Sequence, residues 1–162
     1  MSKEKEHKTN AVREMEAAHA DFTVRYFECP EALSGMEVAA TLGQDPDCVF
    51  KTLVTQAKSG QHYVFMVPVA CELDLKKAAQ AAGEKAITMI KSRELLPLTG
   101  YIHGGCSPVG MKKLFPPVFH ETAASLPVIM VSAGKLGYQI ACDPKALLAL
   151  VRADTADIIT EE

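Results

Sequence analysis

Two runs of β-branched and aromatic residues constrain the fold of this chain more than any other feature. They cover Val49–Ala57 and His62–Val69, and only Lys58–Gln61 separates them. A four-residue connection that contains glycine joins antiparallel neighbours and is too short for the crossover that parallel strands need. The two runs are therefore predicted to form a β-hairpin at the centre of a sheet.

Three further segments have strand character. Phe22, Val24 and Tyr26 recur at the period of two that is typical of a half-buried strand. Pro127–Ser132 and Tyr138–Cys142 are apolar runs joined by a short connection with two glycines. This spacing predicts a second hairpin near the end of the chain.

Five short helices are predicted around these strands, because apolar residues recur at helical spacing or because capping residues and glycines mark the ends. They are expected over about Thr9–Ala18, Gly35–Leu42, Asp74–Ala82, Ser92–Pro97 and Lys145–Val151. Helices and strands mix without a strict βαβ repeat. The expected fold class is therefore α+β, with a mixed, largely antiparallel sheet flanked by short helices.

The chain is the size of one domain. Its 162 residues suit a single core, and we expect one domain over residues 1–162, with residues 1–8 as a flexible N-terminus. No apolar run approaches the roughly 20 residues that span a bilayer, and the N-terminus is too charged for a signal peptide. Five cysteines without a CxxC pair fit a reducing compartment. These features predict a cytoplasmic protein with no membrane partner.

The net charge of −3 gives the chain no general basic field, so nonspecific DNA binding is not expected. Contact with RNA would need a local patch. Three groups are candidates, namely Lys76 with Lys77, Lys91 with Arg93, and Lys112 with Lys113. Pairs of this kind are also common on merely solvated surfaces.

Two segments predict a binding pocket. The stretch Gly100–Gly110 holds four glycines and one proline, so its backbone can approach a ligand and its N–H groups can converge on it. Lys51 stands in an otherwise apolar strand, where burial of an ammonium costs several kcal/mol unless an anion or a dipole meets it. A pocket would supply such a partner, whereas the alternative is a lysine on the solvated face of an edge strand.

These motifs together resemble the YbaK/EbsC family, whose members are stand-alone relatives of the prolyl-tRNA synthetase editing domain. The resemblance is carried by residues 43–53, by Leu73–Lys77 and by the loop 99–113, in the same order as in the family. It extends from about Thr9 to about Ile158. It implies the family fold and a trans-editing deacylase that acts on mischarged tRNA(Pro), in the first place Cys-tRNA(Pro).

The resemblance also implies a reaction without cofactor. In such relatives the cysteinyl thiol of the substrate attacks its own ester, so the enzyme acts as a hydrolase or, by thiol cyclisation, as a lyase. The implied partners are the 3' end of an aminoacylated tRNA and prolyl-tRNA synthetase. The chain has no HExxH, CxxC or clustered carboxylates, so no metal site is expected.

The family pattern assigns site residues to several positions of this sequence. Lys51 falls on the active-site lysine, and Gly104 and Gly105 belong to the loop that holds the ester carbonyl and the ribose. Ser107 and Pro108 complete that loop, and Ser107 either contacts the substrate or makes a local turn bond. Cys106 is a further residue of the loop that we expect to contact substrate rather than to act as a nucleophile, although His103 precedes it by three residues.

Two positions depart from the family pattern. Phe27 occupies the slot of a strand tyrosine, with Tyr26 beside it, and Gln139 occupies the slot of an aspartate. Tyr26 could replace the missing phenol through a one-residue bulge. These departures leave two alternatives open, which are a deacylase of another charged tRNA such as Ala-tRNA(Pro), and a non-catalytic ligand- or RNA-binding module on the same fold.

Overall fold

The structure is a computed structural model that describes residues 8–113 and 115–161. Of the segment 1–8 that we expected to be flexible, residues 1–7 lie outside this described part. The elements in chain order are α1 (Asn10–Ala17), β1 (Phe22–Tyr26), α2 (Gly35–Leu42), β2 (Phe50–Ala57), β3 (His62–Pro68), α3 (Leu75–Ala82), β4 (Ile87–Met89), α4 (Ser92–Thr99), β5 (Val118–His120), a 3-10 turn (Glu121–Ser125), β6 (Ile129–Ser132), β7 (Tyr138–Cys142), α5 (Pro144–Leu150) and β8 (Asp154–Ala156).

The predicted central hairpin forms the middle of the larger sheet. This sheet has five strands in the order β4-β2-β3-β5-β8, and β2 pairs with β3 antiparallel from Phe50 opposite Pro68 to Gln56 opposite His62. The pairs β3–β5 and β5–β8 are parallel. The α+β class with largely antiparallel pairing is confirmed.

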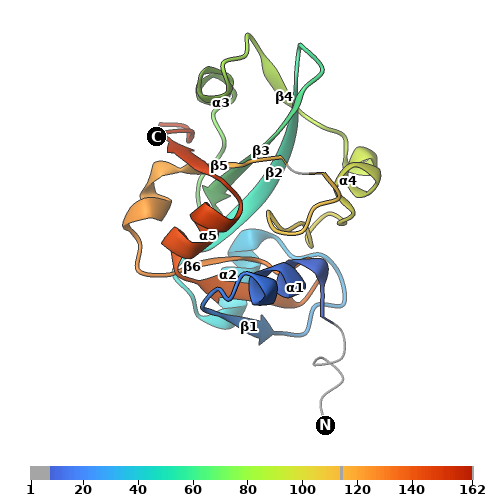
Figure 1. Cartoon of the computed structure of the whole chain (residues 1–162), viewed down its shortest axis with the longest axis vertical. Helices are drawn as coiled ribbons and strands as arrows, with labels where there is room; N and C mark the ends of the chain where they lie inside the picture. Colours follow the sequence, from blue (N-terminus) through green and yellow to red (C-terminus); the bar gives the residue numbers. More distant parts are fainter. Residues whose placement is uncertain (1–7, 114, 162) are drawn as a thin grey trace.

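The second predicted hairpin belongs to a separate sheet. β1, β7 and β6 form three antiparallel strands, and Figure 1 shows them below the long β2–β3 hairpin, beside α1 and α2. A single parallel bridge between Val49 and Met130 connects the two sheets. The sequence predicted one mixed sheet, because nothing in the strand pattern distinguishes strands that pair from strands that only meet at one residue.

Capping chemistry fixes several helix ends where the sequence placed them. Ser34 forms a capping box with Glu37, and α2 ends at Gly43 in the left-handed conformation. The carboxylate of Asp74 accepts the backbone N–H groups of the first turn of α3, and that helix ends at Gly83 with φ of 72°. These short helices thus have local signals at both ends.

Helix α4 runs further than predicted. We expected it to end near Pro97, but Pro97 lies inside the helix, which continues to Thr99 and ends at Gly100. The proline removes only one backbone hydrogen bond, and the buried side chains of Leu95 and Thr99 hold the following turn in place. The strands β4, β5 and β8 were not predicted, because three residues are too few to show a periodic pattern.

The main core lies between the two sheets and the helices that cover them. Side chains from both sheets meet there with those of α1 and α5; among them are Met15, Phe50, Phe119, Ile140 and Leu147, each at most 3% exposed. A smaller cluster lies between the five-stranded sheet and α3. Within the described residues, no helix is long and apolar enough to cross a bilayer. The junction between the sheets leaves one edge open, and the candidate site lies there.

Candidate active site

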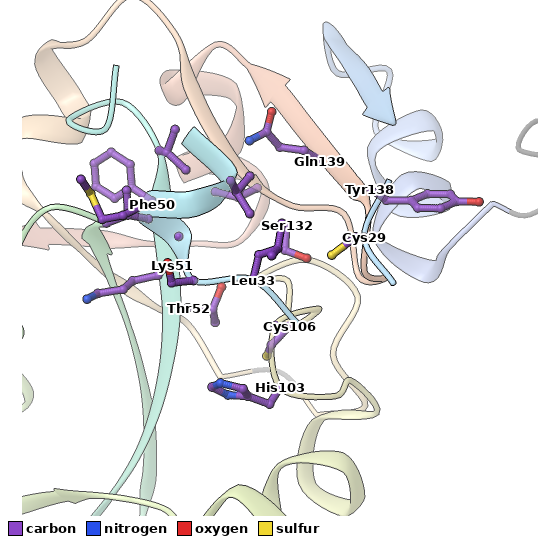
Figure 2. A pocket seen from close by; sticks show the side chains of 18 of the residues that line it. Cys29, Leu33, Phe50, Lys51, Thr52, His103, Cys106, Ser132, Tyr138 and Gln139 are labelled. Atoms are coloured by element: carbon purple, nitrogen blue, oxygen red, sulfur yellow. The ribbon is translucent and has the colours of Figure 1, made fainter. Parts of the chain in front are cut away.

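A cavity of about 460 Å³ lies where the start of β2 meets the three-stranded sheet. Its walls come from the start of β2, from the end of β6 and the start of β7, from α2 with the segment before it, and from the glycine loop that follows α4. Figure 2 shows side chains from these separate elements facing one space. The volume lies in the range of small-molecule sites.

Lys51 lies on the wall of this cavity. Its side chain is 28% exposed, and its amine lies 3.9 Å from a carboxylate oxygen of Glu72, whose own side chain is 82% exposed. Such a long pair with an exposed partner contributes little to stability. Lys51 is therefore held near the pocket without being neutralised by a buried carboxylate, and its amine remains accessible to a ligand.

The start of β2 has an open edge. β4 pairs with β2 only at Thr55–Ala57, so within the described part of the chain Phe50–Leu53 have a strand partner on the β3 side alone. The cavity fills this gap. We expected Lys51 to face the cleft while its neighbours packed elsewhere, but Phe50 and Thr52 border it as well, because the cavity extends around the unpaired edge to both faces of the strand.

Thr52 faces the glycine loop and was not selected by sequence reasoning. Its hydroxyl is buried and has no hydrogen-bond partner among the described residues. Figure 2 shows the Thr52 side chain directed toward Cys106 and His103, whereas the Lys51 amine extends to another side of the strand. A buried hydroxyl without a partner is costly, so a substrate group that satisfies it would gain a favourable contact. The only sequence signal for Thr52 is its position next to Lys51.

The glycine loop approaches the cavity through Gly104. This residue has φ of +85°, and a Cβ placed on it would lie 3.0 Å from Ala32 and 3.1 Å from Leu136. Both the conformation and the space therefore favour glycine. Gly105 is buried and does not line the cavity, and a Cβ placed on it would lie 3.3 Å from the backbone of Lys135 and Leu136. Of the two glycines, only Gly104 presents its backbone to a ligand.

Ser107 and Pro108 are buried behind the wall. The Ser107 hydroxyl accepts the backbone N–H of Val109, so it makes the local turn bond that was the alternative to substrate contact. The Tyr101 hydroxyl donates to the Val109 carbonyl at 2.6 Å. These bonds hold the loop closed, and the structure places Ser107 and Pro108 in its support rather than in the cavity.

Cys106 lines the cavity but is only 7% exposed. Burial raises the pKa of its thiol to about 12, and a hydrogen bond from Thr99 opposes this only in part. A thiol in this state is protonated near neutral pH and is a poor nucleophile. The position of Cys106 on the cavity wall allows an apolar contact, and its contact with substrate stays a prediction.

The first strand places Phe27 on the cavity wall and Tyr26 outside it. Tyr26 is 46% exposed and packs edge-on against Tyr138, with ring centroids 4.8 Å apart. The pairing of β1 with β7 is regular from Phe22 to Tyr26, without the bulge that would turn Tyr26 inward. The proposed replacement of the missing phenol by Tyr26 is therefore wrong, because strand alternation directs its side chain away from the site.

Gln139 borders the cavity, and it is only 3% exposed. Its side-chain amide is paired with that of Gln44, and Figure 2 shows it directed away from Lys51 and Thr52. A neutral amide pair thus stands where the family pattern has a carboxylate. Gln44 was not singled out from the sequence, because it lies 95 residues from its partner.

Within the described residues, no hydrogen bond joins a hydroxyl or thiol of the cavity wall to a histidine or carboxylate that could act as a base. The Ser132 hydroxyl accepts from the backbone N–H of Gly134, and the Cys29 thiol donates to the carbonyl of Glu31. No group of three or more His, Cys, Asp or Glu side chains in the described ranges could hold a metal ion. The arrangement can bind and orient a substrate around a cation and a backbone wall.

Comparisons with known proteins agree with this picture. Residues 29–150 match the model of the aminoacyl-tRNA editing domain family. The chain is 43% identical, over the full length of both proteins, to the candidate Cys-tRNA(Pro)/Cys-tRNA(Cys) deacylase EbsC of Enterococcus faecalis.

Two solved structures share the fold. The crystal structure of a candidate trans-editing enzyme for prolyl-tRNA synthetase is 27% identical, with a TM-score of 0.82 that covers 96% of this chain and 99% of that one. A hypothetical protein at 21% identity has a TM-score of 0.85 over 94% of this chain and 100% of its own. The second likeness concerns the fold alone.

Proposed function

This chain belongs to the aminoacyl-tRNA editing domain family, and we propose that it is a trans-acting deacylase that removes cysteine from mischarged tRNA(Pro). The resemblance to the YbaK/EbsC family found in the sequence is thereby confirmed. We further propose that the whole chain 1–162 forms one editing domain and works in the cytoplasm, where mischarged tRNA arises.

One observation carries the proposal. A chain that matches a candidate Cys-tRNA(Pro)/Cys-tRNA(Cys) deacylase from end to end brings Lys51, Thr52 and Gly104 to the wall of a single cavity. Gly104 is separated from the adjacent residues Lys51 and Thr52 by more than fifty positions in the sequence. Their convergence supplies a cation, a hydroxyl and a backbone wall to one ligand.

We assign the following roles. Lys51 anchors the terminal phosphate or the aminoacyl group through its accessible amine. The backbone of Gly104 lies against the ester and the ribose, where a side chain would block approach. Thr52 donates its unpartnered hydroxyl to a substrate oxygen, and Phe27 and Cys106 supply apolar contact to the amino acid side chain.

The chemical step is intramolecular in this proposal. The cysteinyl sulfur attacks the ester carbonyl carbon, the bond between that carbon and the ribose oxygen breaks, and the thiol proton passes to the leaving oxygen. The products are a cysteine thiolactone and tRNA with a free 3' hydroxyl, and water later opens the thiolactone. The protein contributes position and electrostatic stabilisation, which agrees with a cavity wall that has no activated nucleophile of its own.

Recognition of the tRNA body is a task for a partner as well. The chain is small and carries a net charge of −3, which leaves little surface for reading a whole tRNA. We propose that prolyl-tRNA synthetase presents or hands over the mischarged tRNA.

The test is a deacylation assay with three substrates. Purified protein is incubated with Cys-tRNA(Pro), Cys-tRNA(Cys) and Ala-tRNA(Pro), beside a Lys51→Ala variant. We expect Cys-tRNA(Pro) to be deacylated well above the uncatalysed rate, and Ala-tRNA(Pro), which has no thiol, to stay near background.

Each other result has a defined meaning. Deacylation of Ala-tRNA(Pro) at a similar rate would exclude substrate thiol attack and support the alternative substrate. Background rates with all three charged tRNAs would overturn the enzyme and leave a binding module. The observation that favours testing for a binding module is the neutral Gln44–Gln139 pair, which stands where the family pattern has a carboxylate.

A further inference from the structure

Four exposed cations lie in segments that also supply part of the cavity wall. They are Lys91 and Arg93 at the start of α4, and Lys112 and Lys113 at the end of the glycine loop. We call this group the basic flank. None of the four has an ion-pair partner among the described residues, so no carboxylate neutralises their charges.

The glycine loop folds back so that both parts of the basic flank lie against one helix. The backbone N–H of Lys112 donates to the carbonyl of Thr99 at 2.9 Å, and its amine donates to the carbonyl of Pro97 at 3.3 Å. Lys112 therefore lies at the C-terminal end of α4, while Arg93 lies at its beginning. An eight-residue helix is about 12 Å long, so the two parts of the basic flank lie at opposite ends of a short helix.

The same segments form one wall of the cavity. Leu95 of α4 and His103, Gly104 and Cys106 of the loop line it. A polyanion bound to the basic flank would thus pass next to Gly104. The aliphatic side chains of Leu96 and Ile102, adjacent in sequence to wall residues, are 51% and 47% exposed and could contact sugars or base faces there.

Two of the segments that line the cavity have opposite net charge. Residues 91–113 hold four Lys or Arg and one Glu, which gives +3 within a chain whose net charge is −3. Residues 28–47 hold no Lys or Arg and five exposed carboxylates, at Glu28, Glu31, Glu37, Asp45 and Asp47. This second segment supplies the facing wall from Cys29 to Val38. A nucleic acid is attracted to one side and repelled from the other.

We propose that the basic flank binds phosphates of the tRNA acceptor strand and so directs the 3' end into the cavity across α4 and the glycine loop. This inference rests on the proposed function. The phosphate contacts are sequence-independent and carry a salt dependence that grows with the number of cations involved.

The experiment uses two double variants of the full chain, Lys91→Gln with Arg93→Gln, and Lys112→Gln with Lys113→Gln. The matched control is Lys76→Gln with Lys85→Gln, which removes two exposed lysines from α3 and the turn after it, a region with no residue on the cavity wall. Three readouts are taken, namely kcat/KM on Cys-tRNA(Pro), kcat/KM on cysteinyl adenosine, which carries no phosphate, and binding of uncharged tRNA(Pro).

We expect each flank variant to lower kcat/KM on Cys-tRNA(Pro) about tenfold at low salt and to weaken tRNA binding in parallel. The slope of log kcat/KM against log salt should fall by about 1.5 for each double variant. Turnover of cysteinyl adenosine by the flank variants should stay within about twofold of wild type. The control variant should stay within about twofold of wild type in all three readouts.

Other outcomes overturn the proposal. Equal losses on the tRNA and the adenosine ester would place the effect in the cavity rather than in phosphate binding. An unchanged salt slope with unchanged tRNA binding would show that the acceptor strand does not touch the flank, as would a loss that appears only when prolyl-tRNA synthetase is added. If wild type hydrolyses neither ester, the proposed function fails, and the binding of uncharged tRNA still decides whether the flank holds RNA.

Discussion

The side-chain amides of Gln44 and Gln139 hydrogen-bond to each other in both directions, with nitrogen to oxygen distances of 2.8 and 2.9 Å. Gln139 is buried on β7, and Gln44 directly follows the glycine that ends α2. The pair ties the end of α2 to the three-stranded sheet beside the cavity. The Gln139 amide, which sequence analysis assigned to substrate binding, is used in this pair, so loss of the pair should lower stability in the first place.

We expect Gln44→Ala and Gln139→Ala each to lower the free energy of unfolding by about 1 to 3 kcal/mol, because each leaves a buried or half-buried amide without its partner. The double variant should lose less than the sum, with a coupling of at least about 0.5 kcal/mol. Urea unfolding of the four proteins measures this, with the exposed Gln80→Ala as a control that changes little. Strictly additive losses would show that the two amides do not support each other.

Variants of Lys51 and of its exposed neighbour Glu72 should distinguish an effect on catalysis from an effect on stability. Lys51→Gln is expected to lower kcat/KM on Cys-tRNA(Pro) by about 100-fold, the size of effect typical for loss of one electrostatic contact in an active site. Glu72→Gln breaks the same 3.9 Å pair and should change the unfolding free energy by less than about 1 kcal/mol. Steady-state kinetics and urea unfolding of both variants check this. A similar loss of activity in Glu72→Gln would mean that the pair, and not the amine alone, is required.

Thr52 offers a test of the unpartnered hydroxyl. Thr52→Val keeps the shape and removes a buried oxygen that has no hydrogen bond, so the unfolding free energy should stay the same or rise by up to about 1 kcal/mol. Activity should fall about tenfold, the equivalent of roughly 1.4 kcal/mol, if that hydroxyl bonds the substrate. Thr55→Val is the matched control, because its hydroxyl donates to the carbonyl of Tyr63 and the variant should lose stability. Stable and fully active Thr52→Val protein would remove Thr52 from the site.

Cys106 is the one thiol of the glycine loop, and its removal distinguishes contact from nucleophilic attack. With a thiol pKa of about 12, Cys106→Ala should keep kcat on Cys-tRNA(Pro) within about threefold of wild type. A covalent mechanism would instead lose roughly 10⁴-fold or more. Cys142→Ala, a buried cysteine off the cavity wall, controls for packing losses. Single-turnover deacylation rates give the answer.

The parts of the fold that the sequence predicted well are those with local signals. The capping box at Ser34, the glycine after α3 and the hairpin at Lys58–Gln61 each depend on a few adjacent residues, and each was placed within a residue or two. The two sheets meet at an isolated bridge between Val49 and Met130, and no local sequence pattern shows that strands meet at one residue instead of pairing along their length.

The same distinction applies to the candidate site. Lys51 and Gly104 stand out in sequence because a lysine in an apolar strand and a loop rich in glycine both call for a binding site. The orientation of Tyr26, the open edge of β2 and the partner of Gln139 depend on register and on contacts between distant segments. These features became visible only once β1, β2 and β7 were paired.

Stability should depend on pH through His120, which lies away from the cavity at the end of β5. Its ring is buried, and Nδ1 accepts the backbone N–H of Ile158 at 3.4 Å. Burial lowers the pKa of His120, and Lys77 lowers it further, while the carboxylates of Asp157 and Glu121 oppose the shift. Protonation in the folded state would place a proton on the nitrogen that Ile158 uses.

The direction of the effect follows from proton linkage. Because the folded pKa lies below the unfolded value of about 6.5, the unfolded chain takes up the proton more readily, and stability is lost as the pH falls below about 6.5. Lys77 lowers the pKa of Asp157, so that carboxylate stays charged over this range. In wild type we expect the free energy of unfolding to fall as the pH is lowered from about 7.5 to about 5.5, a range centred on the ordinary histidine pKa of about 6.5. It should fall less in His120→Asn, whose amide oxygen can accept the same backbone N–H of Ile158. Urea unfolding across this pH range, with His62→Asn as the control, makes the comparison, and parallel curves for wild type and His120→Asn would rule out His120 as the source.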